Sequence, residues 1–242
     1  MIDLNIYGWN DNLNQLKQAS AYSTLARGRV SIVHRTCYEV ISENGLLQCE
    51  LTGNMMYGKS DFELPCTGDW VIFQSFDENK GIIVDMLPRE RTLYRKKSGT
   101  VADKQAIASY VDKAFIVQSL DDNFNVRRAE RFMVQVLEES IHPVLVLNKA
   151  DLSFDRLKIE EQMKHIACQV PVFFTSIHQP QTISQLREFI SEGETVVFVG
   201  SSGVGKSSLV NALCEKSVLL TPDTSLSTGK GRHTSTRREM VL

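Results

Sequence analysis

A chain of 242 residues is long enough for one large or two small domains, each with a buried core. Its net charge of −2 excludes a uniformly basic, histone-like protein, although a local basic surface could still bind nucleic acid. No apolar run approaches the length of a membrane span, and the polar residues 1–5 do not fit a signal peptide, so we expect a cytoplasmic protein without membrane contact.

The first half of the chain is typical of a small β-barrel. Residues 10–18 are rich in Asn and Gln and could form a short helix, and residues 52–65 would form a long barrel loop. Five other short runs predict strands: 28–33, 38–42, 46–51, 69–73 and 81–86. Hairpin turns are predicted at Glu43-Asn44-Gly45 and at Glu78-Asn79-Lys80. Five such strands predict an OB-type barrel, whose exposed face commonly binds oligonucleotides; a purely structural barrel is the alternative.

A basic segment follows the barrel. Residues 87–97 contain Pro88, which is followed by arginines and lysines around Tyr94. We place a domain boundary here, with the lead and barrel in residues 1–90 and a second domain in residues 91–242. The basic side chains indicate either contact with the phosphates of RNA or a solvated linker.

Strands and helices alternate in the rest of the chain. The predicted strands are 113–119, 142–147, 170–175 and 195–199, and the predicted helices are 126–140, 156–168, 182–190 and one from 208 to 213. We expect the helix over 126–140 to bury Phe132, Val136 and Leu137 on one side. This alternation predicts an α/β fold with a mainly parallel sheet covered on both faces, in which ligands bind beyond the carboxyl ends of the strands.

A phosphate-binding motif follows the strand at 195–199. The residues Gly200-Ser201-Ser202-Gly203-Val204-Gly205-Lys206-Ser207-Ser208 satisfy G-x-x-x-x-G-K-[ST] and lead into a helical pattern. The glycines let backbone N–H groups turn around phosphate oxygens at a helix N-terminus. Lys206 would reach the β- and γ-phosphates and the Ser207 hydroxyl would bind Mg²⁺, which predicts a nucleoside-triphosphate site.

A second motif selects the base. Asn148-Lys149-Ala150-Asp151 follows the strand at 142–147, and a carboxylate at Asp151 can accept hydrogen bonds from the ring N–H and the amine of guanine, which adenine does not offer together. Asn148 would tie this loop to the phosphate loop, and Lys149 would lie over the base. The alternative is a helix cap at Asp151.

A third segment, Thr175-Ser176-Ile177, resembles the remaining guanine-contacting element of GTPases, with Ile177 in place of a small residue. An ordinary turn at the end of a strand is the alternative. Both base motifs precede the phosphate loop, which reverses the Ras-like order, and circular permutation accounts for this because domain termini lie close together.

With this order, the chain resembles the circularly permuted, ribosome small-subunit-dependent GTPases (RsgA, also called YjeQ or YloQ). Further matching segments are Thr67-Gly68-Asp69-Trp70-Val71, Leu87-Pro88-Arg89, residues 105–112 and residues 229–236. The resemblance implies hydrolysis of GTP to GDP during late maturation of the small ribosomal subunit, with the barrel and basic surfaces contacting ribosomal RNA. We expect a monomer that does not bind DNA.

The resemblance also implies that residues 229–236 are the first switch loop. His233 would contribute to hydrolysis, and Ser235 or Thr236 would complete the Mg²⁺ shell, with Thr236 preferred because it directly precedes Arg237. A flexible loop rich in Ser, Thr and Gly is the alternative.

The chain departs from the family at its end. We find no D-x-x-G motif before Leu242, and the cysteines and histidine of the family's zinc-binding domain are missing. The five scattered cysteines, which contain no C-x-x-C pair, predict reduced thiols instead. We therefore expect a truncated chain that binds guanine nucleotide better than it hydrolyses it. Two other functions stay open: an RNA-binding module with an inert GTPase half, and an ATP-using phosphate-loop protein.

Overall fold

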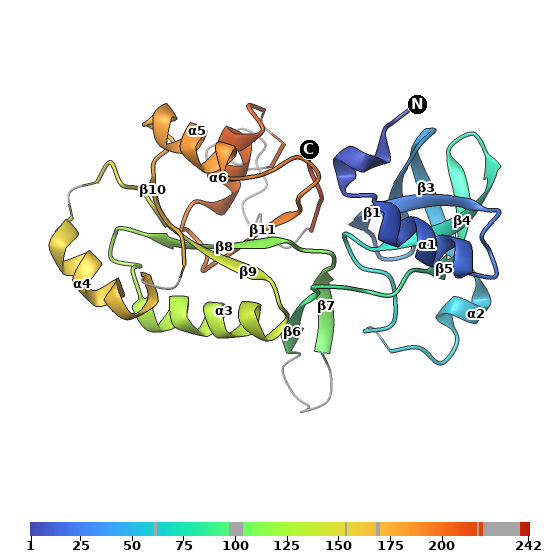
Figure 1. Ribbon diagram of the computed structural model, residues 1–242, viewed down its shortest axis with the longest axis horizontal. Coiled ribbons are helices and arrows are strands. Elements are labelled where there is room, and N and C mark those ends of the chain that lie inside the picture. The colour runs from blue at the N-terminus through green and yellow to red at the C-terminus, as the bar shows by residue number, and fades with distance from the viewer. Residues whose placement is uncertain (61, 97–103, 153, 168–169, 217, 220–237) are drawn as a thin grey trace. The chain divides into compact units, whose positions relative to one another are not determined.

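The computed structural model describes the chain except residues 61, 97–103, 153, 168–169, 217 and 220–237 (Figure 1). Its contacts form two compact units. The first unit comprises Met1–Val111, Glu192–Thr195 and Arg238–Val241, and the second comprises Asp112–Ser191, Val196–Arg237 and Leu242. The main change of unit thus falls after Val111, and the domain boundary at residue 90 stays a prediction.

The first unit contains a closed barrel of five strands in the order β1-β2-β3-β5-β4. Neighbouring strands are antiparallel except β3 and β5, which run parallel. The strands are β1 (Ala26–Val33), β2 (Tyr38–Ser42), β3 (Gly45–Leu51), β4 (Trp70–Asp77) and β5 (Lys80–Met86). The predicted five-stranded barrel of the OB type is therefore confirmed.

The barrel is filled by apolar side chains that point inward from alternate strand positions. The filling is formed by Val30, Val40, Leu47, Cys49, Val71, Phe73 and Ile83. The short helix α2 (Gly53–Met56), which lies in the predicted long loop, adds the buried side chain of Met55. This helix therefore contributes to the same core as the strands that flank it in the sequence.

Two short N-terminal helices cover the outside of the barrel. These are η1 (Leu4–Tyr7) and α1 (Asp11–Ala19), which confirms the helix expected over 10–18. They bury Leu4 and Leu13 in a second cluster with Trp70, and the rings of Trp9 and Trp70 meet edge to face at 4.9 Å. Such aromatic pairs add about 0.5–1.5 kcal/mol to the burial of the rings themselves.

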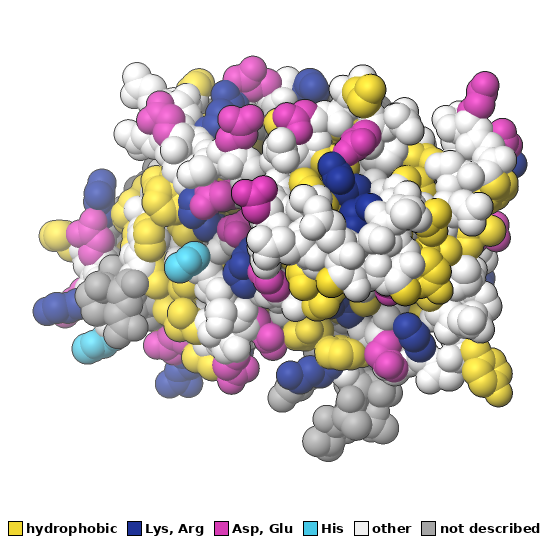
Figure 2. Space-filling model, turned by 45° about the vertical axis from the view of Figure 1, so that its right-hand side comes forward, with side chains coloured by type: hydrophobic (Ala, Val, Ile, Leu, Met, Phe, Trp, Pro, Cys, Tyr) yellow, Lys and Arg dark blue, Asp and Glu magenta, His cyan; other side chains and the backbone are white. Residues whose placement is uncertain are grey.

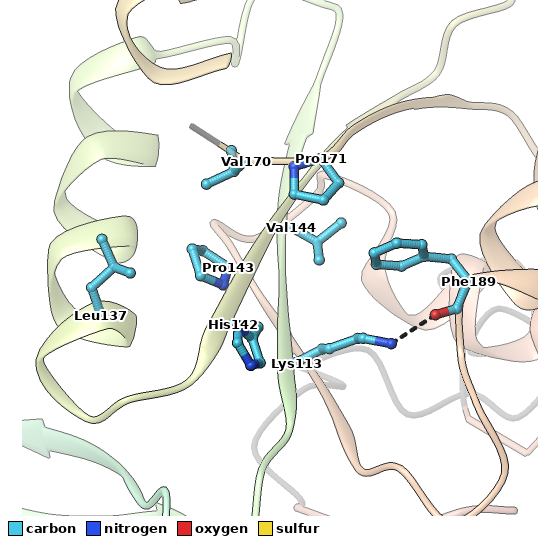
Figure 3. A pocket seen from close by; sticks show the side chains of 8 residues that line it. All are labelled: Lys113, Leu137, His142, Pro143, Val144, Val170, Pro171 and Phe189. Carbon is cyan, nitrogen blue, oxygen red and sulfur yellow. Dashed lines mark hydrogen bonds between the residues drawn. The ribbon is translucent and has the colours of Figure 1, made fainter. Parts of the chain in front are cut away.

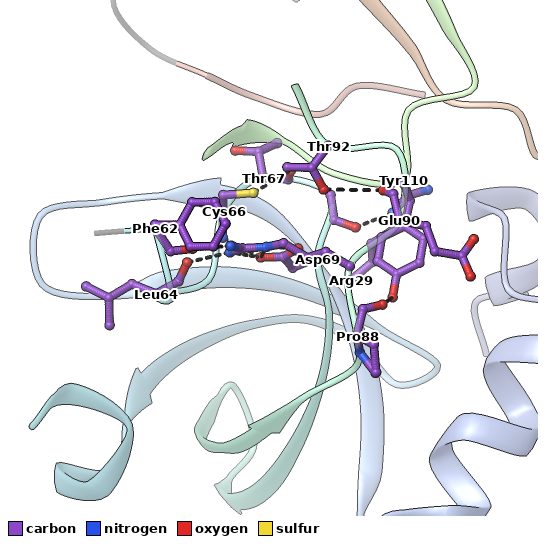
Figure 4. A network of polar contacts seen from close by, with 12 residues as sticks. Arg29, Phe62, Leu64, Cys66, Thr67, Asp69, Pro88, Glu90, Thr92 and Tyr110 are labelled. Atoms are coloured by element: carbon purple, nitrogen blue, oxygen red, sulfur yellow. Dashed lines mark hydrogen bonds and ion pairs between the residues drawn. The ribbon is translucent and has the colours of Figure 1, made fainter. Parts of the chain in front are cut away.

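A buried ion pair ties the loop before β4 to the segment after β5. Asp69 is fully buried and accepts hydrogen bonds from Arg89 Nε at 2.9 Å and Arg89 Nη2 at 2.6 Å, and from the backbone N–H of Cys66 at 2.7 Å (Figure 4). The same guanidinium donates to the carbonyl oxygens of Phe62 and Leu64. Arg89 is therefore not part of the basic surface that the sequence predicted, because its guanidinium is paired with a buried carboxylate inside the first unit.

The rest of the basic segment begins an antiparallel pair of strands, β6 (Leu93–Lys96) and β7 (Lys104–Ala108). Tyr94 of β6 stacks on Phe62 at 5.2 Å between ring centroids, and the Lys104 ammonium lies 5.5 Å from the Tyr94 ring. An isolated bridge joins Ala108 to Thr67 of the barrel unit. The linker interpretation is therefore wrong for residues 93–96, which form a strand of the first unit.

The second unit contains a parallel sheet of four strands in the order β10-β9-β8-β11. Helices α3 and α4 cover one face and α5 and α6 the other (Figure 1). The elements are β8 (Lys113–Ser119), α3 (Val126–Glu138), β9 (His142–Asn148), α4 (Arg156–Ala167), β10 (Val172–Thr175), α5 (Pro180–Glu188), β11 (Val196–Val199) and α6 (Lys206–Leu213). The predicted α/β fold and covered parallel sheet are confirmed.

Helix α3 differs from the prediction in the side that it buries. Ala129, Met133 and Val136 are buried, whereas Leu137 is 52% exposed, so its predicted burial is wrong. Residues 129, 133 and 136 are spaced by four and three positions and share one face of a helix. Leu137 lies about 100° further round from Val136 and falls outside that face.

The charged side chains are mixed in sign. Figure 2 shows lysines and arginines interspersed with aspartates and glutamates across the described part of the face in view.

Within the described residues, every helix is too short or too polar to cross a membrane. The thiols of the four described cysteines are free, in agreement with the predicted reduced state; they are Cys37, Cys49, Cys66 and Cys214.

Candidate nucleotide-binding site

The sequence motifs meet at one edge of the parallel sheet. The loops after β8, β9, β10 and β11 all follow the carboxyl ends of parallel strands, so they emerge on the same side. The loop after β11 is the phosphate-binding motif, and the loops after β9 and β10 carry the predicted base contacts. This is the place where open α/β sheets bind ligands.

The phosphate loop needs glycine at the two positions where it touches its neighbours most closely. Gly205 has φ +93°, and a Cβ there would lie 2.3 Å from Asn148 Nδ2. Gly200 has φ +153°, and a Cβ there would lie 2.4 Å from the carbonyl oxygen of Val117. Helix α6 starts at Lys206, directly after Gly205, which places the free N–H groups of its first turn at the end of the loop.

Lys206 lies across the phosphate loop. Its Nζ donates hydrogen bonds to the carbonyl oxygens of Gly200 at 3.1 Å and Ser201 at 2.6 Å. Burial lowers the pKa of this lysine, and no carboxylate of the described residues lies within ion-pair distance of it. Within the described part of the chain, the ammonium is therefore held by neutral oxygens alone, and its positive charge is available to an anionic ligand.

The phosphate-loop residues on the two sides of the Gly205–Lys206 step differ in burial. Val204 is fully buried, whereas Ser207 and Ser208 occupy the first turn of the helix and are partly exposed. The binding of Mg²⁺ by Ser207 stays a prediction. His233, Ser235 and Thr236 lie outside the described residues.

Asn148 joins the base loop to the phosphate loop, as the sequence predicted. Its Nδ2 donates to the carbonyl oxygen of Val204 at 2.9 Å, and its Oδ1 accepts from the Thr175 hydroxyl at 3.2 Å. The side chains of Asn148 and Thr175 are both buried, so these bonds are shielded from water. One side chain thus connects the loops after β9, β10 and β11.

Lys149 makes an ion pair that the sequence analysis did not predict. Lys149 has φ +64°, and its Nζ lies 2.7 Å from Oδ2 of Asp121, in the loop after β8. Burial alone would raise the pKa of Asp121, but hydrogen bonds from Lys149, the Ser119 hydroxyl and the Asn123 N–H outweigh it and lower that pKa to about 2. Asp121 is therefore ionised and fixes the lysine that we expect to lie over the base.

Asp151 and Ser176, the predicted guanine contacts, are neighbours. The Ser176 hydroxyl donates to Oδ1 of Asp151, and this bond lowers the pKa of the carboxyl group. The backbone N–H of Ala150 donates to the Thr175 carbonyl at 3.0 Å and ties the two loops together. Ile177 is 46% exposed beside them. The carboxylate is ionised and exposed, which suits recognition of paired N–H donors.

Two residues of this edge were missed by the sequence analysis. Asn123, in the loop after β8, donates through Nδ2 to the Ser202 carbonyl at 3.1 Å and to Ser201 Oγ at 3.3 Å. Arg128, on α3, donates through Nη1 to Asn123 Oδ1 at 2.8 Å and to Ser201 Oγ at 3.0 Å. Both residues reach the phosphate loop because β8 pairs with β11, and the sequence pattern alone does not specify that pairing.

A pocket of about 300 Å³ lies at the opposite edge of the sheet (Figure 3). It includes the first residues of β8 and β9, Lys113 and His142, and is otherwise lined by Leu137, Pro143, Val144, Val170, Pro171 and Phe189. Lys113 Nζ donates to the Phe189 carbonyl at 2.8 Å and lies 4.5 Å from the centre of its ring. The pocket is mainly apolar and far along the strands from the phosphate loop, so it is not part of the nucleotide site.

A family model described as RsgA GTPase matches residues 86–242. The small ribosomal subunit biogenesis GTPase RsgA 1 of Bacteroides thetaiotaomicron is 74% identical over 99% of this chain. The chain belongs to the RsgA GTPase family. A second RsgA relative, the small ribosomal subunit biogenesis GTPase of Methanosarcina acetivorans, is 37% identical over 98% of the chain. The chain spans 68% of the length of the first relative and 64% of the second.

Solved structures resemble this RsgA-family chain in fold. The crystal structure of YjeQ from Thermotoga maritima matches with a TM-score of 0.61 and 26% identity, over 78% of this chain and 64% of its own. YloQ, described as a circularly permuted GTPase, matches with a TM-score of 0.57 and 23% identity, over 79% of this chain and 65% of its own. The second likeness concerns the fold alone. Together with the order of the loops, these matches confirm the circularly permuted fold.

Proposed function

We propose that this chain is a GTPase that binds guanine nucleotide with Mg²⁺ and hydrolyses GTP to GDP during biogenesis of the small ribosomal subunit. The observation that carries the proposal is the hydrogen bond from Asn148 to the Val204 carbonyl. It couples the loop that would read guanine to the loop that would hold phosphates, so one nucleotide can contact both. Membership of the RsgA GTPase family supports the same activity.

The chemistry of the site fits a guanosine polyphosphate. The close approach of Gly205 to Asn148 leaves room for backbone alone. Lys206 lies along the same loop, and its described partners are two backbone carbonyl oxygens. Mg²⁺ would neutralise part of the phosphate charge, with the Ser207 hydroxyl at the start of α6 as its protein ligand. The roles of His233 in hydrolysis and of Thr236 at the metal stay predictions.

The partner that we propose is the small ribosomal subunit and its RNA, because both named relatives are small ribosomal subunit biogenesis GTPases. On the first unit, the ammonium of the exposed Lys104 lies 5.5 Å from the ring of Tyr94, which stacks on Phe62. The exposed Arg95 adds a second cation on the same strand as Tyr94. Cations beside aromatic rings suit contact with single-stranded nucleic acid. A cytoplasmic location follows from this partner, and a monomeric state without DNA binding stays a prediction.

The test of base selection is a calorimetric titration of the chain with GDP and with ADP, both with Mg²⁺. We expect GDP to bind at least about 100-fold more tightly, because Asp151 would be left with unpaired acceptors against adenine. Asp151→Ala should remove this preference. Asp122→Ala is the matched control, since Asp122 is an exposed carboxylate in a loop at the same edge of the sheet.

Two results would contradict the proposal. Equal affinity for ADP and GDP would indicate an ATP-using protein, and no binding by a folded chain would favour an RNA-binding module. If GDP binds selectively, GTP turnover is then measured with isolated ribosomal subunits. Stimulation by the small subunit and not by the large one is the result that supports a role in small-subunit biogenesis.

A further inference from the structure

We propose that Arg128 supplies a second positive charge to the phosphate groups of the bound nucleotide, beside Lys206, and that Asn123 and Ser201 position it. This inference rests on the proposed function, because it concerns the same site. Neither the phosphate-loop motif nor the base motif includes Arg128. The residue comes to the site from a different helix, α3, through contacts between side chains.

The local structure explains how Arg128 reaches the phosphate loop. The Asn125 side chain caps α3 by accepting from the Arg128 N–H at 3.0 Å, which places Arg128 in the first turn. Side chains in a helix point back toward its N-terminus, so the guanidinium is directed toward the loop after β8. Strand β8 pairs with β11, and the loops that follow these two strands are therefore adjacent.

Three side chains form a closed polar cluster at the start of the phosphate loop. Arg128 Nη1 donates to Ser201 Oγ at 3.0 Å and to Asn123 Oδ1 at 2.8 Å. Asn123 Nδ2 donates to the same Ser201 Oγ at 3.3 Å and to the Ser202 carbonyl at 3.1 Å. The guanidinium is thus fixed against the loop at two atoms, and the Ser201 hydroxyl accepts from both partners.

Among the described residues, no carboxylate neutralises the charge of Arg128. All its contacts are with neutral oxygens, and no carboxylate in the described part of the chain lies within ion-pair distance. Three other arginines, Arg89, Arg156 and Arg187, each face a carboxylate instead. Arg128 is partly buried and is hydrogen-bonded to Ser201 of the phosphate loop. Its guanidinium therefore raises the positive potential where the phosphates would lie.

The sequence of the loop supports this assignment. Ser201 occupies an unspecified position of G-x-x-x-x-G-K-[ST], so the motif does not require a hydroxyl there. The structure gives that hydroxyl a role as the acceptor that joins the loop to Arg128 and Asn123. Ser201→Ala should therefore loosen the guanidinium while leaving the net charge unchanged.

The test compares Arg128→Gln with Arg127→Gln. Arg127 is the exposed neighbour in the same helical turn and loses the same charge. Affinities for guanosine, GDP and GTP are measured with Mg²⁺, by competition against a fluorescent GDP analogue. We expect Arg128→Gln to weaken GTP about tenfold, GDP several-fold and guanosine by less than about twofold, because a charge acts in proportion to the ligand's phosphate charge. Arg127→Gln should leave all three within about twofold, and Arg128→Lys should recover part of the loss.

The outcomes separate this inference from the proposed function. If the unaltered chain binds neither GDP nor GTP, both fail. If it binds both and Arg128→Gln behaves like Arg127→Gln, only the role of Arg128 is overturned. An equal loss for guanosine and GTP would also overturn it, since that pattern shows support of the loop and not action on phosphate. Should Arg128→Gln not fold, Ser201→Ala decides in its place: a loss confined to the phosphorylated ligands supports the inference, and no loss overturns it.

Discussion

Arg89 in the first unit and Arg128 in the second are both held by several hydrogen bonds, but their partners differ. Arg89 contacts the buried carboxylate of Asp69, which raises the pKa of the guanidinium against the effect of burial, and two backbone carbonyls. Arg128 contacts a hydroxyl, an amide and a carbonyl, all of them neutral. The partner of a cation therefore indicates its role: a carboxylate neutralises it within the fold, whereas neutral oxygens fix its position and leave its charge for a ligand.

The same distinction holds for the two lysines of the nucleotide site. Lys206 is bonded to carbonyl oxygens of the phosphate loop, and Lys149 is paired with Asp121. We therefore expect Lys206 to act on the charge of the ligand and Lys149 to act through its fixed position. Three substitutions test this comparison: one in a buried ion pair, one at a lysine bonded to carbonyl oxygens, and one in a partly exposed ion pair.

The largest effect is expected from Asp69→Ala. It leaves the Arg89 guanidinium buried without a counter-charge, and breaking such a pair typically lowers the free energy of unfolding by about 3–5 kcal/mol. Both tryptophans of the chain, Trp9 and Trp70, belong to the core of the first unit, so tryptophan fluorescence during urea unfolding reports on this unit.

The control for Asp69→Ala is Asp77→Ala. Asp77 faces Lys80 at 3.8 Å, and both side chains are 58% exposed. Exposed pairs of this kind contribute about 0–1 kcal/mol. Equal losses for the two substitutions would show that Arg89 finds other partners and that its ion pair is not what holds the loop before β4.

The second effect, from Lys206→Met, concerns affinity and not folding. We expect GDP affinity to fall about 100-fold, because the substitution removes a cation next to the phosphates in a partly buried site. The free energy of unfolding without nucleotide should stay equal or rise by less than about 1 kcal/mol, since burial lowers the pKa of this lysine and thus disfavours its ammonium in the folded state. Calorimetry and thermal unfolding measure the two quantities. A large loss of stability would contradict the comparison by showing that the fold depends on this charge.

Much of the fold and of the motif residues could be predicted because the signals are local. The barrel strands alternate at period two, and both nucleotide motifs are contiguous and follow apolar strands. The tie from Asn148 to the phosphate loop was predictable for the same reason. The strand β6 was missed because its basic residues resembled a linker, and its pairing depends on residues later in the chain.

The contacts of Asn123 and Arg128 could not be predicted from local pattern. Their contacts with the phosphate loop join residues separated by 73 to 79 positions, and these contacts depend on which strands pair in the sheet. Nothing in the composition of α3 distinguishes Arg128 from its exposed neighbour Arg127. Only the turn of the helix, set by the Asn125 cap, directs one of them to the phosphate loop.

The smallest effect is expected from Asp121→Asn, which tests the ion pair with Lys149. The two side chains are 30% and 35% exposed, so solvent screening limits the contribution of the pair to less than about 1 kcal/mol. Since the folded state lowers the pKa of Asp121 from 3.8 to about 2, the carboxylate stabilises the fold above the unfolded pKa. This contribution is complete above about pH 5 and is lost as the pH falls through 4 toward 2.

The difference in unfolding free energy between the unaltered chain and Asp121→Asn should therefore be constant from about pH 5 to 8 and disappear in acid. Circular dichroism during urea unfolding at a series of pH values measures it, and Asp122→Asn, an exposed neighbour, controls for the change in net charge. A difference that persists at pH 2 would mean that the effect of the substitution does not come from the charge of Asp121, because that charge is largely lost in acid. In that case Lys149, like Arg128, would be a cation whose charge the protein leaves available to the nucleotide.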